Sequence, residues 1–306
     1  MRQAPHAPIL AWMKVLVTGS SGRIGRAICR RLCADHDVTG LDALPSPATD
    51  VVGNITDLQL VKALLPRVDA VVHAAALHAP HVGIVADTLF DQVNVQATRA
   101  LAEMAIAAGV ARFVFTSTTA LYGVSPPPGA PAVWVDETLE PHPVTVYHRS
   151  KLAAEALLQA LSTQHSLAVT VLRMSRCFPE PAPQMAAYRL HRGIDARDVA
   201  EAHALALQRA TPGFQRYVVS GAPPFTEDDL PGLARDAPAV LTRRAPALAE
   251  AFARRGWPLP ASIDRVYSPA LAMAALGWRP RYDFTEVLAM LDRGSPEVLA
   301  PAARRA

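Results

Sequence analysis

The sequence predicts an α/β protein built on a doubly wound parallel sheet, followed by a smaller C-terminal lobe. Short β-branched runs alternate with longer Ala/Leu-rich segments, so strands and helices follow one another repeatedly. Several runs are apolar at consecutive positions, which is typical of parallel strands covered on both faces. A glycine-rich turn, 18-TGSSGRIG-25, joins the first run to the first helical segment.

In chain order, the predicted strands cover residues 14–18, 37–41, 50–53, 69–73, 111–116, 168–173 and 216–220. The predicted helices between them cover residues 22–34, 57–65, 87–108, 147–165 and 198–210. Beyond residue 221 the chain becomes rich in Pro, Ala and Arg, with helical patterns at 226–235, 245–255, 267–278 and 284–294. We expect this part to form the smaller lobe. The proline-rich segments 124–134 and 179–183 are expected to be loops, either ordered loops near a cleft or flexible loops on the surface.

Composition excludes several classes of protein. The formal charge is only +3 and no Lys/Arg block is longer than two residues, which argues against nucleic acid as a partner. No apolar run approaches the roughly 20 residues of a membrane-spanning helix. The first 12 residues lack the pattern of a secretion signal, and we exclude them from the fold. Three cysteines without a Cys-x-x-Cys pair favour a reducing cytoplasm over a disulfide framework.

The glycine turn predicts a dinucleotide site. Glycines at this point let the backbone approach a pyrophosphate, and the helix that follows offers free N–H groups. The residues expected to contact the cofactor here are Gly19, Ser21, Gly22, Arg23, Ile24 and Gly25. Asp42 ends the second strand, where its carboxylate can accept hydrogen bonds from the adenine ribose and would repel a 2′-phosphate. We therefore predict NAD over NADP, although a guanidinium at Arg23 could pair with an extra phosphate.

With these features, the chain resembles the extended short-chain dehydrogenase/reductases, within the NAD-dependent nucleotide-sugar epimerase/dehydratase family. The resemblance covers residues 13–294. The segments that carry it, in the family's order, are 18-TGSSGRIG-25, Asp42, 53-GNITD-57, 73-HAAA-76, 94-NVQAT-98, 116-TSTTALYG-123, 147-YHRSK-151, 172-LRMSRCF-178, 198-DVAEAH-203 and 276-LGWRPRYD-283.

The resemblance implies a Rossmann NAD-binding domain of residues 13–173 and 198–221, and a substrate-binding lobe of residues 174–197 and 222–294. Residues 1–12 and 295–306 are then tails. The implied adenine contacts are Asn54 and Ile55, and the implied contacts toward the nicotinamide ribose and phosphates are Ala74, Ala75, Ala76 and Ser175. Asn54 replaces the family's usual Asp. We interpret His73 as a hydrogen-bonded core residue, because it ends a strand, and Asn94 as a residue that pins a helix. No metal-binding residue is assigned.

Tyr147 and Lys151 lie four positions apart, so on a helix they share one face. A free phenol, with its pKa near 10, is a poor base at neutral pH, but a neighbouring ammonium and a positive nicotinamide ring both favour phenolate. Thr118 matches the family's Ser/Thr position, which implies a hydrogen bond to the substrate oxygen. The resemblance thus implies that Tyr147 moves the proton while Lys151 keeps the tyrosine anionic and anchors the nicotinamide ribose.

Two places where the sequence differs from the family pattern limit the reaction types and substrates that are expected. Dehydratases of the family carry an Asp-Glu pair after the active-site threonine, whereas this chain has Thr119 and Ala120, which disfavours dehydration. The segment that usually grips the nucleotide diphosphate is shortened to 182-APQMAAYRL-190, and Arg176 replaces the substrate-contacting Asn. Arg176, Arg189 and Arg192 could bind a phosphate or carboxylate. The stretch 177-CFPEP-181 also resembles uronate dehydrogenases.

Three functions remain open. The first is an NAD-dependent nucleotide-sugar 4-epimerase, and the second is an NAD-dependent dehydrogenase of a uronate or related sugar or alcohol. The third is a non-catalytic dinucleotide-binding sensor, against which Thr118, Tyr147 and Lys151 argue. The resemblance also implies a homodimer formed by helices 87–108 and 147–165. Leu101, Met104, Leu157 and Leu161 are expected on their outer faces, although these side chains could equally pack on the sheet.

Overall fold

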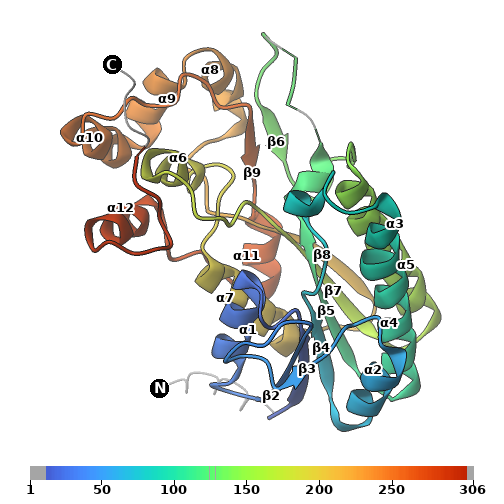
Figure 1. The fold of residues 1–306 in the computed structure, drawn as a ribbon. Coiled ribbons are helices and arrows are strands. Elements are labelled where there is room, and N and C mark those ends of the chain that lie inside the picture. The colour runs from blue at the N-terminus through green and yellow to red at the C-terminus, as the bar shows by residue number, and fades with distance from the viewer. Residues whose placement is uncertain (1–11, 124, 128, 302–306) are drawn as a thin grey trace, which may run out of the picture.

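The computed structural model describes residues 12–123, 125–127 and 129–301. At its centre is a seven-stranded sheet whose strands all run parallel, in the order β3-β2-β1-β4-β5-β7-β8. These strands are β1 (Lys14–Thr18), β2 (Asp37–Asp42), β3 (Val51–Val52), β4 (Ala70–His73), β5 (Arg112–Thr118), β7 (Ala168–Met174) and β8 (Phe214–Val219). The strand order reverses between β1 and β4, which is where α/β sheets bind their ligands. The predicted fold class is confirmed (Figure 1).

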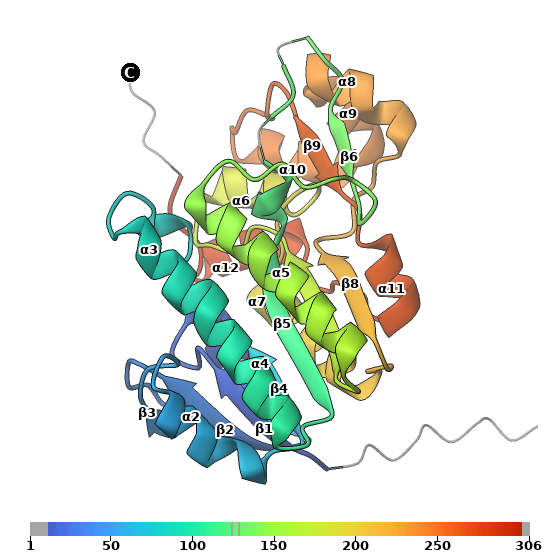
Figure 2. The same cartoon turned by 90° about the vertical axis from the view of Figure 1, so that its right-hand side faces the viewer.

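Helices cover both faces of the sheet (Figures 1 and 2). One face carries α1 (Arg23–Leu32), α7 (Ala196–Gln208) and α11 (Ala270–Leu276), and the other carries α2 (Leu58–Leu64), α4 (Ala97–Ala107) and α5 (Val146–Gln164). Along β1, Val15 and Val17 enter the first core and Leu16 enters the second, because successive side chains of a strand point to opposite faces. Burial on both sides explains the continuous apolar runs in the sequence.

The helix predicted at 87–108 forms as one continuous rod with an irregular middle. It consists of α3 (Asp87–Phe90), a π-helical stretch at Asp91–Gln96 and α4. Asn94 lies in the π-helical stretch, where its side chain accepts a hydrogen bond from Leu77 N at 2.8 Å and donates one to Ser150 Oγ at 2.9 Å. The expectation that Asn94 pins a helix is therefore confirmed: it ties the loop after β4 to α5.

The smaller lobe contains more structure than the sequence indicated. Its helices are α6 (Ala182–Tyr188), α8 (Leu230–Arg235), α9 (Ala237–Arg244), α10 (Pro246–Arg254) and α12 (Phe284–Asp292). Two short strands, β6 (Val133–Val135) and β9 (Arg265–Tyr267), pair in parallel and were not predicted, since three-residue strands leave almost no pattern. Tyr267 belongs to β9, and the helix predicted from this residue begins only at Ala270, after Pro269. Short 3-10 helices lie at Leu65–Arg67, Ala79–His81, Thr119–Tyr122 and Glu227–Asp229.

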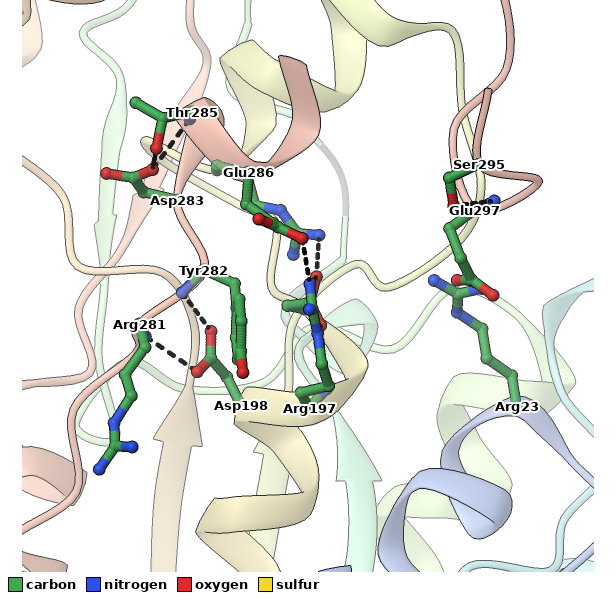
Figure 3. Close-up of polar contacts among 12 residues, drawn as sticks. Arg23, Arg197, Asp198, Arg281, Tyr282, Asp283, Thr285, Glu286, Ser295 and Glu297 are labelled. Atoms are coloured by element: carbon green, nitrogen blue, oxygen red, sulfur yellow. Dashed lines mark hydrogen bonds and ion pairs between the residues drawn. The ribbon is translucent and has the colours of Figure 1, made fainter. Parts of the chain in front are cut away.

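Two of the motif segments meet where the lobe joins the sheet (Figure 3). The buried Asp198 carboxylate, in the first turn of α7, accepts hydrogen bonds from Arg281 N at 2.9 Å and Tyr282 N at 3.1 Å. Its backbone carbonyl accepts one from Trp278 Nε1 at 3.0 Å. Beside it, the Arg197 guanidinium lies 3.5 Å from the Tyr282 ring centroid and pairs with Glu286. This clasp fixes the segment 278–286 to the N-terminus of α7.

The division into two domains remains a proposal. Two separate apolar clusters support it, but two segments pack in the cluster of the other domain. A separate apolar cluster unites α6, α8, α9, α10 and α12, as expected for the substrate-binding lobe. Ala132 joins this cluster from the first half of the chain, whereas α11 and Trp278 pack in the sheet core. Residues 295–301, expected within a tail, pack on the protein, because Val298 is buried and Leu299 N donates to Glu180 O at 3.0 Å.

The leucines expected on a dimer face lie in the core. Leu101, Leu157 and Leu161 are buried between the sheet and α4 or α5, and Met104 packs against the same cluster. Of the two placements that the sequence left open, packing on the sheet is confirmed and the outward-facing placement was wrong. The exposed side of α5 instead carries Arg149, followed by small or polar residues.

Within the described ranges, no helix is long and apolar enough to cross a bilayer.

We predict that Asp198→Ala lowers the free energy of unfolding by about 2–4 kcal/mol, because two backbone N–H groups lose the buried carboxylate that accepts their hydrogen bonds. Urea denaturation followed by circular dichroism measures this loss. The matched control is Glu286→Gln, which removes a partly exposed partner of Arg197 and should cost less than about 1 kcal/mol. Equal losses in the two variants would contradict the role given to Asp198.

Candidate functional site

The glycine turn is tightly built against the strand ends. Gly19 has φ +77°, and its N–H donates to Leu41 O at 2.8 Å, so the turn crosses from β1 to β2. A Cβ at Gly19 would lie 2.6 Å from Ala75 N, and one at Gly25 would lie 1.9 Å from Gly19 O. Both positions therefore require glycine. Gly22 caps α1 without a side-chain hydrogen bond, which leaves the N–H groups of that helix end without a side-chain acceptor.

Asp42 lies beside this turn at the end of β2. Its carboxylate accepts hydrogen bonds from Ser21 N at 3.0 Å and Leu44 N at 2.9 Å, so the acid is held next to the glycine loop, as the sequence predicted. Arg23 is turned elsewhere, since its guanidinium pairs with Glu297 of the C-terminal segment (Figure 3). Ile24 packs against the sheet core. The possibility that Arg23 pairs with a 2′-phosphate therefore loses support.

The residues after β4 line the neighbouring strand end. Ala74 N donates to Thr18 O at 3.1 Å and Ala75 N donates to Thr18 Oγ1 at 3.3 Å, which brings Ala74, Ala75 and Ala76 beside the glycine turn. His73 is fully buried between Thr18 Oγ1 at 2.7 Å and Thr98 Oγ1 at 2.8 Å. Burial lowers the pKa of His73 to about 3, so the ring is neutral. The interpretation of His73 as a hydrogen-bonded core residue is confirmed.

Asn54 and Ile55, the expected adenine contacts, follow β3. The Asn54 side-chain oxygen accepts hydrogen bonds from Thr56 N at 3.0 Å and Thr56 Oγ1 at 2.9 Å. Ile55 is buried in the core on that side of the sheet. The role of both residues toward adenine stays a prediction, and the oxygen expected to accept from adenine already serves Thr56.

Thr118 and Tyr147 come together at the end of β5. Thr118 is the last residue of β5, and Tyr147 lies in the first turn of α5, where Thr145 caps the helix by accepting from His148 N at 3.2 Å. The Thr118 side chain lowers the pKa of the Tyr147 phenol, but burial outweighs this effect and raises that pKa to about 12. The expected lowering by Lys151 is thus not produced by the chain's own groups, because desolvation is the larger effect.

Lys151 is buried one helical turn beyond Tyr147. Its ammonium lies 3.8 Å from the centroid of the Phe115 ring, a cation–π contact in the interior. Burial lowers the pKa of Lys151 to about 7, and the nearby Glu155 carboxylate acts in the opposite direction. The structure therefore brings Thr118, Tyr147 and Lys151 to one place, with Lys151 close to its protonation midpoint near neutral pH.

Behind this group lies a buried ion pair that the sequence analysis missed. Glu155 and Arg173 are both fully buried, and Arg173 Nη2 lies 2.7 Å from Glu155 Oε2. A signal for it was present, since Tyr147, Lys151 and Glu155 follow one another at four-residue intervals on one helix face. The unpredicted strand β6 is linked to this ion pair through Tyr122: Arg173 Nη1 donates to Tyr122 OH, which donates to the carbonyl oxygen of Asp136, the residue after β6.

Ser175 supports the fit of this edge to a dinucleotide. It follows Met174, which pairs with Thr118 in the sheet, and its N–H donates to Val219 O at 2.9 Å. Its hydroxyl is buried and has no hydrogen-bond partner among the residues that the structure describes. A buried hydroxyl without a partner is costly unless another molecule satisfies it. Together with the glycine turn, Asp42 and the free N–H groups of α1, this hydroxyl fits the cofactor that the sequence predicted.

The three arginines expected near the substrate differ in availability. Arg189 is buried and pairs with Asp195 at 3.0 Å, so it serves the interior of the lobe. Arg192 pairs with Asp264 at 3.3 Å. Arg176 keeps 44% of its side chain exposed, pairs with Glu180 at 2.6 Å and lies over the rings of Phe178 and Tyr188. Of the three, Arg176 is the one best placed to meet a ligand.

Comparisons with known proteins agree with this arrangement. Residues 15–187 match the family described as "NAD dependent epimerase/dehydratase family". The chain is 30% identical to dTDP-glucose 4,6-dehydratase of Streptomyces antibioticus, over 90% of each protein. It is 31% identical to L-arabinose 1-dehydrogenase (NAD(P)(+)) of Haloferax volcanii, over 53% of this chain and 66% of that protein. The crystal structure of Thermus thermophilus UDP-glucose 4-epimerase with NAD superposes with a TM-score of 0.64 and 27% identity, covering 90% of this chain and 96% of that one.

We predict that Asp42→Ala relaxes the preference for NAD over NADP by at least about tenfold in kcat/KM, because the ribose loses an acceptor and a 2′-phosphate is no longer repelled. Asp57→Ala is the matched control. Asp57 also accepts two backbone N–H groups, from Gln59 and Leu60, but it caps α2 away from the glycine turn. The interpretation of Asp42 fails if the coenzyme ratio of Asp42→Ala equals that of the control.

Proposed function

The chain belongs to the NAD dependent epimerase/dehydratase family, and from that premise we propose that it is a nucleotide-sugar 4-epimerase. In this proposal it oxidises a sugar hydroxyl with bound NAD and then returns the hydride to the other face of the sugar. The observation that carries the proposal is the placement of Thr118 and Tyr147 beside the buried Lys151, with the pKa of Tyr147 lowered by Thr118 and raised by burial. Titratable side chains with strongly shifted pKa values are typical of functional sites, and these lie at the strand ends where α/β sheets bind ligands.

Each of the three side chains has a distinct task. Thr118 holds the substrate hydroxyl, and Tyr147 accepts its proton and later returns it. Lys151 supplies positive charge one turn away and anchors the cofactor ribose. NAD, when bound, supplies the hydride acceptor and a positively charged ring at this edge of the sheet. Because the chain alone holds the Tyr147 phenol protonated, with its pKa at about 12, a neighbouring cation is needed for base catalysis at neutral pH.

The residues after Thr118 argue against dehydration, despite the similarity to a dehydratase. Elimination of water needs its own acid and base. At the positions where dehydratases of the family carry Asp and Glu, this chain has the buried Thr119 and the half-buried Ala120, and neither can exchange a proton as a carboxyl group does. Loss of that pair leaves oxidation and re-reduction as the chemistry that the remaining groups support.

We propose that side chains around a small recess beside the end of β7 take part in substrate recognition. Arg176, Phe178, Glu180 and Tyr188 line it, so it combines a guanidinium, a carboxylate and two aromatic rings. Sugar rings pack on aromatic faces while charged groups bind their hydroxyl or phosphate groups. We propose that Arg176 contacts the part of the substrate beyond the reacting sugar.

A second candidate function is an NAD-dependent dehydrogenase of a uronate or another sugar. The similarity to L-arabinose 1-dehydrogenase favours it, as does the shortened segment 182–190. The two functions differ in the fate of the hydride. An epimerase retains NAD and interconverts UDP-sugars without added cofactor, whereas a dehydrogenase accumulates reduced nicotinamide when offered NAD and a sugar acid.

A homodimer through α4 and α5 is also proposed. The two helices lie side by side on one face of the sheet (Figure 2), and their outer surfaces are polar or small rather than leucine-rich. Any interface there would therefore be formed by close helix packing and polar contacts rather than by a large apolar patch.

We predict that Tyr147→Phe lowers turnover at least about a hundredfold, because the proton acceptor is removed, while NAD affinity stays within about threefold. Interconversion of UDP-glucose and UDP-galactose and titration with NAD measure the two quantities. Tyr217→Phe is the control, since it removes a hydroxyl on β8 whose contact, Gln215 Oε1 at 3.5 Å, lies outside the site. Turnover of Tyr147→Phe at the rate of this control would exclude the proposed role.

A further inference from the structure

Glu155 lies on the same face of α5 as Tyr147 and Lys151, one turn beyond the lysine. Its side chain is fully buried, with 0% exposure. A carboxylate in the interior is costly unless it is paired and hydrogen-bonded. The groups that satisfy it therefore show what its placement achieves.

Three strands contribute those groups. From β5, Ser117 Oγ donates to Glu155 Oε1 at 2.5 Å. From β7, Arg173 forms a bidentate ion pair, donating through Nη2 to Oε2 at 2.7 Å and through Nε to Oε1 at 3.1 Å. From β8, Arg216 Nε lies 3.2 Å from Oε2. One carboxylate thus joins α5 to the part of the sheet that presents the site.

These partners are neighbours of the site residues. Ser117 directly precedes Thr118, so its hydrogen bond fixes the end of β5 against α5. Arg173 Nη1 donates to Tyr122 OH at 2.8 Å, and Tyr122 ends the short helix Thr119–Tyr122 that Thr118 begins. The carboxylate therefore links the strand that carries Thr118 to the helix that carries Tyr147 and Lys151.

We propose that Glu155 is a positioning residue that keeps the Lys151 side chain charged and holds Thr118 and Lys151 in one arrangement. The inference rests on the proposed function, in which Lys151 acts as a cation. It concerns charge as well as geometry, and the two effects can be separated because a glutamine preserves the shape of the side chain and removes its charge.

The charge state of Lys151 depends on the groups around it and around Glu155. Burial lowers the pKa of Lys151, and Glu155 is the charged neighbour that raises it. His73 is neutral, with its pKa lowered to about 3. The titratable and charged groups around the two residues are Tyr147 on α5, His73 on β4, Tyr122 after β5, Glu137 after β6, Arg173 on β7 and Arg216 on β8.

Removal of the Glu155 charge is expected to lower the pKa of Lys151. Lys151 is charged below its pKa and neutral above it, so loss of Glu155's negative charge moves the change to lower pH. In Glu155→Gln, Lys151 is then neutral at a pH where it is charged in the native protein. A purely structural role of Glu155 would reduce activity at every pH without moving this midpoint.

The chain is well suited to a direct measurement, because it has only three lysines, Lys14, Lys62 and Lys151. Lys14 and Lys62 are exposed, whereas Lys151 is buried. NMR of the full-length protein labelled with ¹³C at lysine Cε gives three signals, and Lys151→Met identifies the one from Lys151. Titration with pH, before and after addition of NAD, then measures the Lys151 midpoint without any enzymatic assay.

In Glu155→Gln the midpoint of Lys151 should fall by about one pH unit relative to the native protein under the same condition. In Glu155→Asp, which keeps the carboxylate, it should stay within about half a unit. An unchanged midpoint in Glu155→Gln, or equal shifts in the two variants, overturns the proposal. If Glu155→Gln does not fold, the double variant Glu155→Gln/Arg173→Met removes both charges of the buried pair, and it is compared with Arg173→Met, which keeps the Glu155 carboxylate. The Lys151 midpoint of the double variant should lie about one pH unit below that of Arg173→Met, and equal midpoints overturn the proposal.

The pH dependence of kcat provides the second readout. Its high-pH limb should move down with the Lys151 midpoint in Glu155→Gln and return in Glu155→Asp. Asp229→Asn is the control, since Asp229 is also a buried carboxylate paired with two arginines, Arg243 and Arg244, but in the other lobe. It should lower the melting temperature without moving the limb, and a moved limb would overturn the proposal. If native turnover does not need Tyr147, the proposed function fails while the NMR midpoint still decides the role of Glu155.

Discussion

A positive charge held in the interior of the protein is the constraint on which the site depends. Lys151 lies under the Phe115 ring with its side chain buried, so its charge exists only because neighbouring groups compensate for lost hydration. The same burial raises the pKa of the Tyr147 phenol. Burial thus disfavours the charged form of both side chains, and the charges of neighbouring groups decide their protonation.

The sheet explains why these groups meet. Parallel strands end at one edge, and the order of the strands reverses between β1 and β4, so the glycine turn, Ala74–Ala76, Thr118 and Ser175 all face that edge. The clasp around Asp198 then fixes the C-terminal lobe beside it. The edge where the strands end and the recess beside the end of β7 are thus products of one topology and one set of buried polar contacts.

The sequence was sufficient for the sheet, its helices and the grouping of Thr118, Tyr147 and Lys151, because apolar runs and the spacing of glycines, acid and Tyr-x-x-x-Lys reflect local structure. It failed where structure depends on distant partners. The short strands β6 and β9 form only by pairing with each other, and Leu101 could be placed in the core only once the sheet was known. Glu155 looked like an ordinary helix residue, since its partners come from strands 38, 18 and 61 positions away, at Ser117, Arg173 and Arg216.

The central claim is that the Tyr147 phenol, with Lys151 behind it, faces the reactive ring of a dinucleotide bound at the glycine turn. A crystal structure of the protein with NAD tests it most directly. The account predicts the pyrophosphate on the N-terminus of α1, the ribose beside Asp42 and the nicotinamide end within hydrogen-bond reach of Lys151 and the free Ser175 hydroxyl. A dinucleotide bound elsewhere, or a Tyr147 side chain directed away from the nicotinamide, would contradict it.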